Sequence, residues 1–195
     1  MSRAAAVDQL KDVYGILSAD MDAVMVYGTT HPTPFTHRTV VRTFFSMVEG
    51  LAFQMRQVTL ATLEPYGRLS VAEIALLREE RYSLNSKGEP QTKESFQPAL
   101  SSLLFTLRNY VKNHGASFTP NVSHHGWQAM QRSVDIRNRV THPRSVADLS
   151  LSEEDQKKLV DASHWWKRTL MAMFDACDRA DAEATQGAKV KQHGV

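Results

Sequence analysis

Cysteine is almost absent from this chain of 195 residues, and this scarcity excludes two common ways of bracing a small protein. The single Cys177 can form neither an internal disulfide nor a cysteine-based zinc site. Such cysteine usage fits the reducing cytoplasm. The N-terminus lacks the pattern of a signal peptide, and charged residues interrupt every long apolar stretch. We therefore expect a cytoplasmic protein without a membrane span.

An excess of charge of one sign is missing as well. The 23 Lys and Arg residues nearly balance the 21 Asp and Glu residues, so the formal net charge is only +2. This balance excludes a general polyanion binder, and any nucleic-acid site must come from local clustering. Four arginines gather between residues 132 and 144 and are offset only by Asp135 (Arg132, Arg137, Arg139 and Arg144). Glycine-rich phosphate loops, a GxSxG element and an HExxH pair are absent, and we predict no cofactor and no metal site.

Sustained strand-like alternation and internal repeats are also lacking, whereas apolar residues recur at helical spacing. This spacing predicts helices at about 6–27, 35–63, 70–81, 96–113 (with Phe96 on the apolar face), 123–141 and 152–179. Segment 83–95 contains Gly88 and Pro90 and almost no apolar residue, so we expect a loop there. The predicted fold class is all-α, a single bundle of five to six helices over residues 1–180. A flexible tail is expected at 181–195.

The stretch 135–144 concentrates chemically useful side chains at the end of one predicted helix. Trp127, Met130 and Val134 form the apolar stripe of this helix, and Arg137 and Asn138 fall on either shoulder of the stripe. In a continuous helix, His142 would point about 140° away from Arg137. The residue before a proline is pushed out of the α region, and Pro143 follows His142. We therefore expect His142 just beyond the helix end, free to turn back towards Arg137.

An arginine and a histidine at the edge of a packed helix are suited to phosphate-ester chemistry or to phosphate binding. The guanidinium matches phosphate oxygens, and imidazole exchanges protons near neutral pH. The ordinary alternative is that both cations merely complement the negative end of the helix dipole. Glu49 belongs to a row with Arg42 and Arg56 at heptad spacing, which usually flanks a packed seam. A more specific hypothesis places Glu49 beside Arg137, as a carboxylate that orients it.

The segment Arg137-Asn138-x-x-x-His142 resembles the R-x4-6-H motif of the HEPN family, in which a polar residue, commonly Asn, follows the Arg. The resemblance implies a helical bundle that pairs as a homodimer and cleaves RNA without metal. His142 would be the general acid or base, Arg137 would stabilise the transition state, and Asn138 would orient the phosphate or hold the histidine.

Supporting roles would fall to Glu49, Arg139 and Arg144. Many members of the family are toxins or antiviral-defence effectors, often with an antitoxin or defence partner protein, although this chain carries no sign of such a partner. The alternative is a non-catalytic HEPN-like module for dimerisation or binding, or a helical bundle unrelated to the family.

Overall fold

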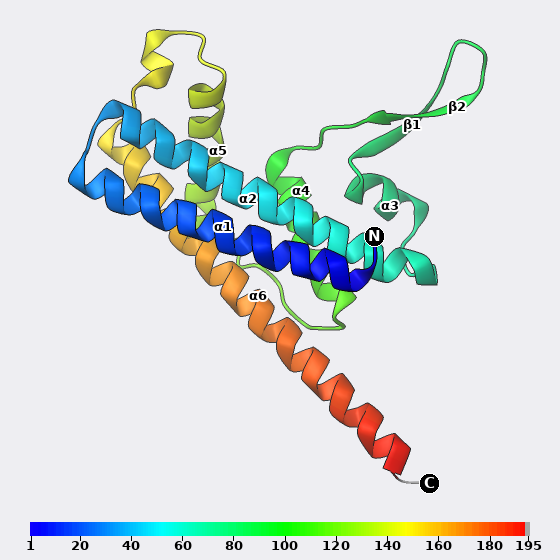
Figure 1. The fold of residues 1–195 in the computed structure, drawn as a ribbon. Coiled ribbons are helices and arrows are strands. Elements are labelled where there is room, and N and C mark those ends of the chain that lie inside the picture. Colours follow the sequence, from blue (N-terminus) through cyan, green and yellow to red (C-terminus); the bar gives the residue numbers. More distant parts are fainter. Residues whose placement is uncertain (194–195) are drawn as a thin grey trace.

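Six α-helices and one β-hairpin make up the part of the chain that the structure describes (Figure 1). The structure is a computed structural model, and it describes the backbone of residues 1–193 and the side chains of residues 1–187. The helices are α1 (Arg3–Thr30), α2 (Pro34–Leu63), α3 (Val71–Leu77), α4 (Ala99–Asn113), α5 (His125–Thr141) and α6 (Glu153–His193). The strands are β1 (Glu80–Leu84) and β2 (Pro90–Glu94), and the short 3-10 helices are η1 (Glu64–Tyr66) and η2 (Val146–Leu149). With 74% of the chain helical, the all-α prediction is confirmed.

Local sequence signals fix the ends of several helices. Thr33 caps α2, because its hydroxyl accepts from the Thr36 amide at 3.2 Å, and Pro34 follows in the first turn. Ser70 and Glu73 form the predicted capping box at the start of α3. These caps satisfy amides that have no partner inside the helix, which explains why the predicted starts of both helices agree with the structure.

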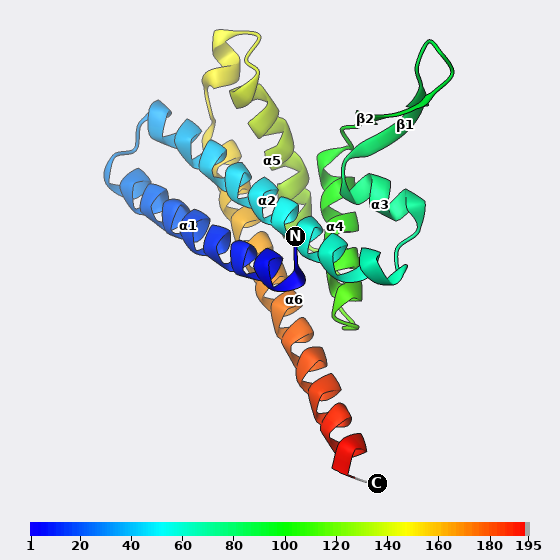
Figure 2. The ribbon, with the colours of Figure 1, turned by 45° about the vertical axis from the view of Figure 1, so that its right-hand side comes forward.

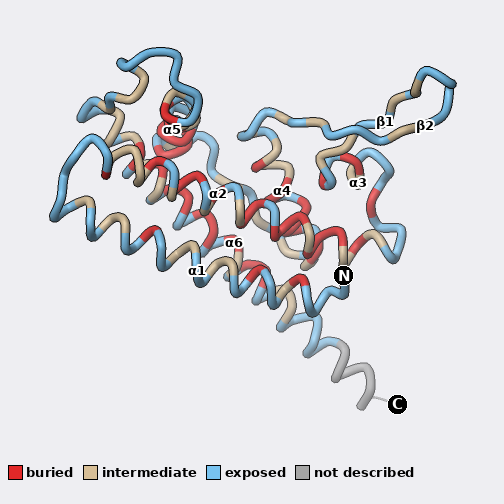
Figure 3. The backbone as a smooth tube through the Cα atoms, turned by 45° about the horizontal axis from the view of Figure 1, so that its top comes forward, coloured by how far each residue is buried: buried red, intermediate tan, exposed pale blue. Residues whose placement is uncertain are grey.

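Helix α2 is the centre of the bundle. It runs antiparallel to α1 and also contacts α4, α5 and α6 (Figures 1 and 2). Buried side chains from four helices meet around it, among them Phe44, Met55, Leu107, Met130 and Trp166. Figure 3 shows the buried positions gathered on the inward faces of the helices, while the hairpin is largely exposed. The long helix predicted at 35–63 is therefore the spine of the fold.

Helices α5 and α6 approach each other closely at Gly126. A Cβ atom at this position would lie 2.6 Å from Cβ of Trp165, well inside contact distance. The indole of Trp165 packs on that of Trp127 and donates from Nε1 to the Asn121 carbonyl at 3.0 Å. A glycine is thus required here so that the helix carrying the arginine cluster can seat against α6.

The segment predicted to be a loop at 83–95 is instead the greater part of an antiparallel hairpin. Strands β1 and β2 pair in register from Glu80 opposite Glu94 to Leu84 opposite Pro90. Asn85 organises the turn, because its side-chain carbonyl accepts from the amides of Lys87 and Glu89, both at 2.9 Å. Gly88 adopts the left-handed conformation that closes the turn. The hairpin is held by backbone pairing and turn chemistry, and the prediction failed because it relied on apolar alternation.

Several helix boundaries differ from the predicted ones. Helix α1 extends three residues beyond its predicted range at each end, from Arg3 to Thr30. Helix α3 ends at Leu77, four residues early, because Glu79 takes a left-handed φ of 56°. Helix α4 begins at Ala99, since Pro98 keeps the residue before it out of the α region. Phe96 is consequently not on a packed helix face, and it is 85% exposed.

The last helix is longer than predicted. It was expected to end near Arg179, but α6 continues as a helix to His193, and in Figure 1 its C-terminal part extends beyond the bundle. The flexibility of a tail at 181–195 stays a prediction, and residues 194 and 195 lie outside the described residues. Despite the length of α6, no helix in the described part of the chain is long and apolar enough to cross a membrane.

Candidate functional site

The C-terminal end of α5 carries the motif residues, and Pro143 shapes it as predicted. The helix ends at Thr141, and His142 leaves the α region with φ −127° and ψ 62°. The His142 amide still donates to the Asn138 carbonyl at 2.9 Å, so its backbone completes the last turn. The side chain of His142 is exposed to solvent. An exposed imidazole at a helix end is available for proton transfer to a ligand.

Arg137 is held in place by two side chains. Its Nη2 donates to Oε1 of Glu49 at 2.6 Å, and its Nη1 donates to Oδ1 of Asn138 at 3.1 Å. The contact between Glu49 and Arg137 that was raised as a hypothesis is therefore present. The side chain of Asn138 lies against Arg137, and its expected action on a phosphate or on the histidine stays a prediction. Together the carboxylate and the amide fix the direction of the guanidinium.

Arg137, Asn138 and Glu49 line one groove, of about 750 Å³, between α2, α4 and α5. The segment 96–98 that follows the hairpin forms another wall. Much of the lining is apolar, and two phenylalanines on it are well exposed, Phe53 at 47% and Phe96 at 85%. The groove thus combines a fixed cation with exposed aromatic surface.

His142 is not among the residues that line this groove. It follows Arg137 by five residues, which on a helix corresponds to about 140° of rotation and about 7.5 Å of rise. The bonds of Arg137 direct it towards α2, where Glu49 lies. The structure therefore brings Glu49, Arg137 and Asn138 together and leaves His142 apart from them.

A second ion pair anchors α2 at the far end of the groove. Arg56 is buried, and its Nη2 lies 3.1 Å from Oε2 of Glu79, the residue with the left-handed backbone. Burial lowers the pKa of Arg56, and the neighbouring Glu79 carboxylate opposes that shift. Arg42, Glu49 and Arg56, noted in the sequence for their heptad spacing, thus make separate contacts with α5 or with the root of the hairpin.

Arg139 takes part in the start of α6. Its Nη2 donates to Oδ2 of Asp155 at 3.0 Å, and the same carboxylate accepts from the Ser152 amide at 3.1 Å. Burial alone would raise the pKa of Asp155, but the hydrogen bonds from Ser152 and Arg139 outweigh burial and lower it. The structure thus gives Arg139 a clear part in joining α5 to α6.

The part played by Arg38 and the contact of Arg42 were not predicted from the sequence. Nη1 of Arg38 donates to the Leu149 carbonyl at 3.1 Å, and Nη2 of Arg42 donates to the Val140 carbonyl at 3.4 Å. Val140 is in the last turn of α5, whose carbonyls lack helical partners. The four-residue spacing of these two arginines on α2 was the only signal in the sequence.

Arg144 is exposed, and its backbone amide donates to the Asp148 carboxylate at 2.8 Å. Five arginines and His142 therefore surround the end of α5; the arginines are Arg38, Arg42, Arg137, Arg139 and Arg144. Three carboxylates lie among them, those of Glu49, Asp148 and Asp155. Counting five positive and three negative charges leaves a local excess of two even with His142 neutral. An excess of positive charge at an accessible helix end favours an anionic ligand.

His124 and His125 lie at the start of α5. His124 precedes α5, and its Nδ1 accepts from the Gly126 amide at 3.0 Å, so it caps the helix. Among the described residues, no group of three or more His, Cys, Asp or Glu side chains is arranged to hold a metal ion.

Comparison of the chain with models of protein families, with curated proteins and with solved structures gave no match.

Proposed function

We propose that this protein is a metal-independent endoribonuclease of HEPN type. RNA carries its own nucleophile, because the 2′-hydroxyl lies beside the phosphodiester that it can attack. The 2′-oxygen forms a bond to phosphorus as the bond to the 5′-oxygen breaks, which leaves a 2′,3′-cyclic phosphate and a 5′-hydroxyl. One group must take the proton of the 2′-hydroxyl, another must protonate the leaving oxygen, and a cation must stabilise the added negative charge.

The observation that carries this proposal is that the guanidinium of Arg137 is held in one direction and keeps N–H donors free for a ligand. A guanidinium has five N–H donors, and Glu49 and Asn138 accept from two of them. The other three donors can bind a ligand, because the side chain of Arg137 is 30% exposed. A guanidinium with a fixed direction and free donors suits a phosphate whose charge grows in the transition state. His142 supplies the proton-transfer group at the same helix end.

Two copies of the chain would complete the site. One copy offers a single motif histidine, whereas the reaction needs an acid and a base, and a homodimer would supply two histidines and two arginines. The exposed Phe53 and Phe96 beside Arg137 offer surfaces on which unpaired bases could stack. We therefore place RNA across the groove of a homodimer. Use of this activity as a toxin or antiviral-defence effector, with an antitoxin or defence partner protein, belongs to the same proposal.

A second candidate function is a non-catalytic module for dimerisation or binding, and one observation favours it. Glu49 lies 2.6 Å from Arg137 and already balances its charge, while His142 does not line the same groove. The motif would then be an anion site or a structural network. The two candidates differ in turnover of RNA, which can be measured directly.

The test compares the wild-type protein with His142→Ala and Arg137→Ala on mixed RNA in EDTA. Matched controls are His164→Ala, an exposed histidine on α6, and Arg179→Ala, an exposed arginine on α6 outside the arginine cluster. Cleavage that gives 2′,3′-cyclic phosphate ends, is lost in both motif variants and is retained in both controls would support the nuclease. Circular dichroism and sedimentation would show that the variants keep their fold and oligomeric state. If the folded wild-type protein leaves RNA intact, the binding module becomes the better proposal.

A further inference from the structure

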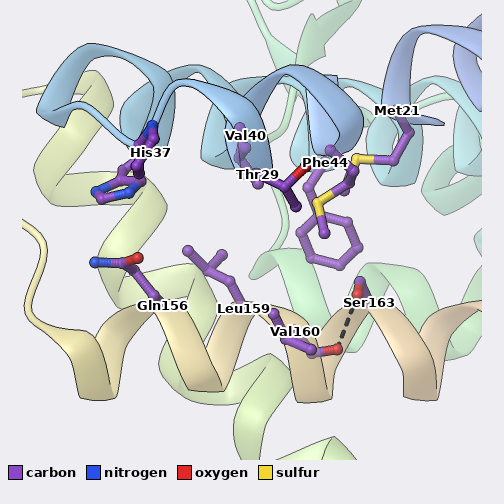
Figure 4. A pocket seen from close by; sticks show the side chains of 12 residues that line it. Met21, Thr29, His37, Val40, Phe44, Gln156, Leu159, Val160 and Ser163 are labelled. Carbon is purple, nitrogen blue, oxygen red and sulfur yellow. Dashed lines mark hydrogen bonds between the residues drawn. The ribbon is translucent and has the colours of Figure 1, made fainter. Parts of the chain in front are cut away.

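A second cavity, separate from the groove, lies between α1, α2 and α6 (Figure 4). Its volume is about 370 Å³, and it shares no lining residue with the groove beside Arg137. Met21 and Met25 of α1, Phe44 of α2 and Leu159 of α6 give it an apolar interior. Two consecutive helices and the last helix of the chain therefore line one partly open, mainly apolar pocket.

Four polar side chains line the pocket, and two of them, His37 and Gln156, lie at one end. Figure 4 shows His37 of α2 and Gln156 of α6 facing each other across the space, whereas Met21 and Phe44 lie towards the other end. The side chains that line it, all in the described part of the chain, include no Asp, Glu, Lys or Arg. The one hydrogen bond drawn among them runs from the Ser163 hydroxyl to the Val160 carbonyl at 2.8 Å. His37 and Gln156 thus keep their hydrogen-bonding groups free for a ligand.

The size of the space also points to a ligand. A dry apolar cavity of about 150 Å³ is sufficient for benzene, and small-molecule sites start at about 300 Å³ with mostly apolar walls and a few polar groups. Methionines adapt their shape to what they enclose, and two of them contribute to this wall. The cavity has the volume for an apolar body roughly twice the size of benzene.

We propose that this cavity binds a small uncharged amphiphile. Its apolar body of two fused rings, or a chain of similar volume, lies between Met21, Met25 and Phe44. A hydroxyl or amide head forms hydrogen bonds with His37 and Gln156, both of which can donate and accept. A charged head is disfavoured because the lining supplies no opposite charge to compensate for its desolvation. The proposal does not depend on ribonuclease activity.

Titration calorimetry with 2-naphthol tests this binding, and naphthalene-2-sulfonate is the charged probe with the same ring. The wild-type protein is expected to bind one 2-naphthol per chain and to bind the sulfonate at least about tenfold more weakly. Met25→Trp fills the cavity and should abolish binding. Val26→Trp is the matched control, because Val26 is the next residue of α1, is 67% exposed and does not line the cavity. His37→Leu should weaken 2-naphthol binding about tenfold through loss of one head-group hydrogen bond.

Val160→Trp, from the opposite wall, replaces Met25→Trp if that variant does not fold. The proposal is overturned if the folded wild-type protein shows no saturable binding of 2-naphthol, or if filling the cavity leaves binding unchanged. It is also overturned if Val26→Trp weakens binding as much as Met25→Trp does. Sedimentation of the same samples tests whether a second copy of the chain occupies the cavity instead. If the wild-type protein is a dimer that binds no probe, and Met25→Trp converts it to a monomer, the cavity is an interface between copies.

Discussion

If Arg137 acts on RNA as proposed, removing the carboxylate of Glu49 should reduce turnover strongly and stability only slightly. Its ion pair with Arg137 is short at 2.6 Å, but the two side chains are 51% and 30% exposed. Exposed pairs contribute about 0.2–1 kcal/mol to stability, because water already screens the charges. We therefore expect Glu49→Ala to lower the free energy of unfolding by less than about 1 kcal/mol.

The expected loss of activity is larger because Glu49 is a positioning residue for Arg137. Displacement of a catalytic group by about 1 Å can cost roughly a hundredfold in rate, and loss of an oxyanion donor costs about 10²- to 10³-fold in kcat. Glu49→Ala should therefore lower kcat for RNA by about tenfold to a hundredfold. Glu49→Gln keeps an acceptor for the guanidinium and should recover part of this loss.

Asp155→Ala provides the matched comparison for this pair. Its carboxylate also accepts from an arginine of α5, but it is 13% exposed and caps α6 through the Ser152 amide. Loss of such a cap costs about 0.5–2 kcal/mol, so Asp155→Ala should destabilise the fold more than Glu49→Ala does and leave kcat unchanged. Urea unfolding and RNA turnover measured on the same samples give both quantities. The reasoning fails if Glu49→Ala costs more than about 2 kcal/mol of stability, or if it is fully active.

Three further predictions concern the rest of the chain. Hydrogen bonds from the Ser70 amide, then from the Lys112 and Ser70 side chains, lower the pKa of Glu73 to about 2. The carboxylate therefore stabilises the fold above its ordinary pKa of about 4.5, and this contribution is lost as pH falls from there towards 2. Glu73→Gln should narrow the stability difference between pH 6 and pH 2.5 in urea unfolding, and an unchanged difference would contradict this. Burial first, then Asp181 and Asp178, raises the pKa of Cys177 to about 11, so a thiol reagent at pH 8 should label it only as fast as the protein opens. Immediate labelling of native protein would show that the thiol is accessible. Arg81 stands directly opposite Lys93 in the hairpin, and Arg81→Glu should raise stability by about 0.2–1 kcal/mol in urea, whereas a loss would indicate that Arg81 has another partner.

The helices were predictable from the sequence because each buries an apolar stripe. Phe44, Met130 and Trp166 recur at helical spacing with their neighbours, and all three are fully buried in the fold. The hairpin carried no such signal, since Tyr82 and Leu84 are exposed and its turn depends on one asparagine. The end of α3 was missed because the left-handed backbone of Glu79 is tied to a tertiary pair with Arg56, which no local pattern reveals.

The candidate site shows a similar division. The exit of His142 from the helix followed from Pro143, a local effect, and heptad spacing on α2 was enough to raise the pairing of Glu49 with Arg137. The contacts of Arg38, Arg42 and Arg139 depend on how α2, η2 and α6 dock around the end of α5. Docking of this kind is set by side-chain packing between segments far apart in the chain, which periodicity along one helix does not encode.

The separation of His142 from the groove makes a specific prediction about how two copies would share the chemistry. Arg137 lines the groove and His142 does not, so we expect a dimer cleft to combine the arginine of one copy with the histidine of the other. In a two-fold dimer that arrangement occurs twice. Mixing Arg137→Ala and His142→Ala chains in equal amounts, unfolding them together and refolding them would give about one half mixed dimers, each with one Arg137 and one His142 on opposite chains. If one such pair is enough for turnover in its own cleft, about a quarter of wild-type turnover should return, whereas none should return if one shared cleft needs both histidines as acid and base. Either variant refolded alone should stay inactive. No recovery in a mixture shown by mass spectrometry to contain mixed dimers would mean either that both histidines act in one shared cleft or that each cleft takes both residues from one chain. In the second case His142 must turn back across the end of α5 to reach the phosphate held by its own Arg137.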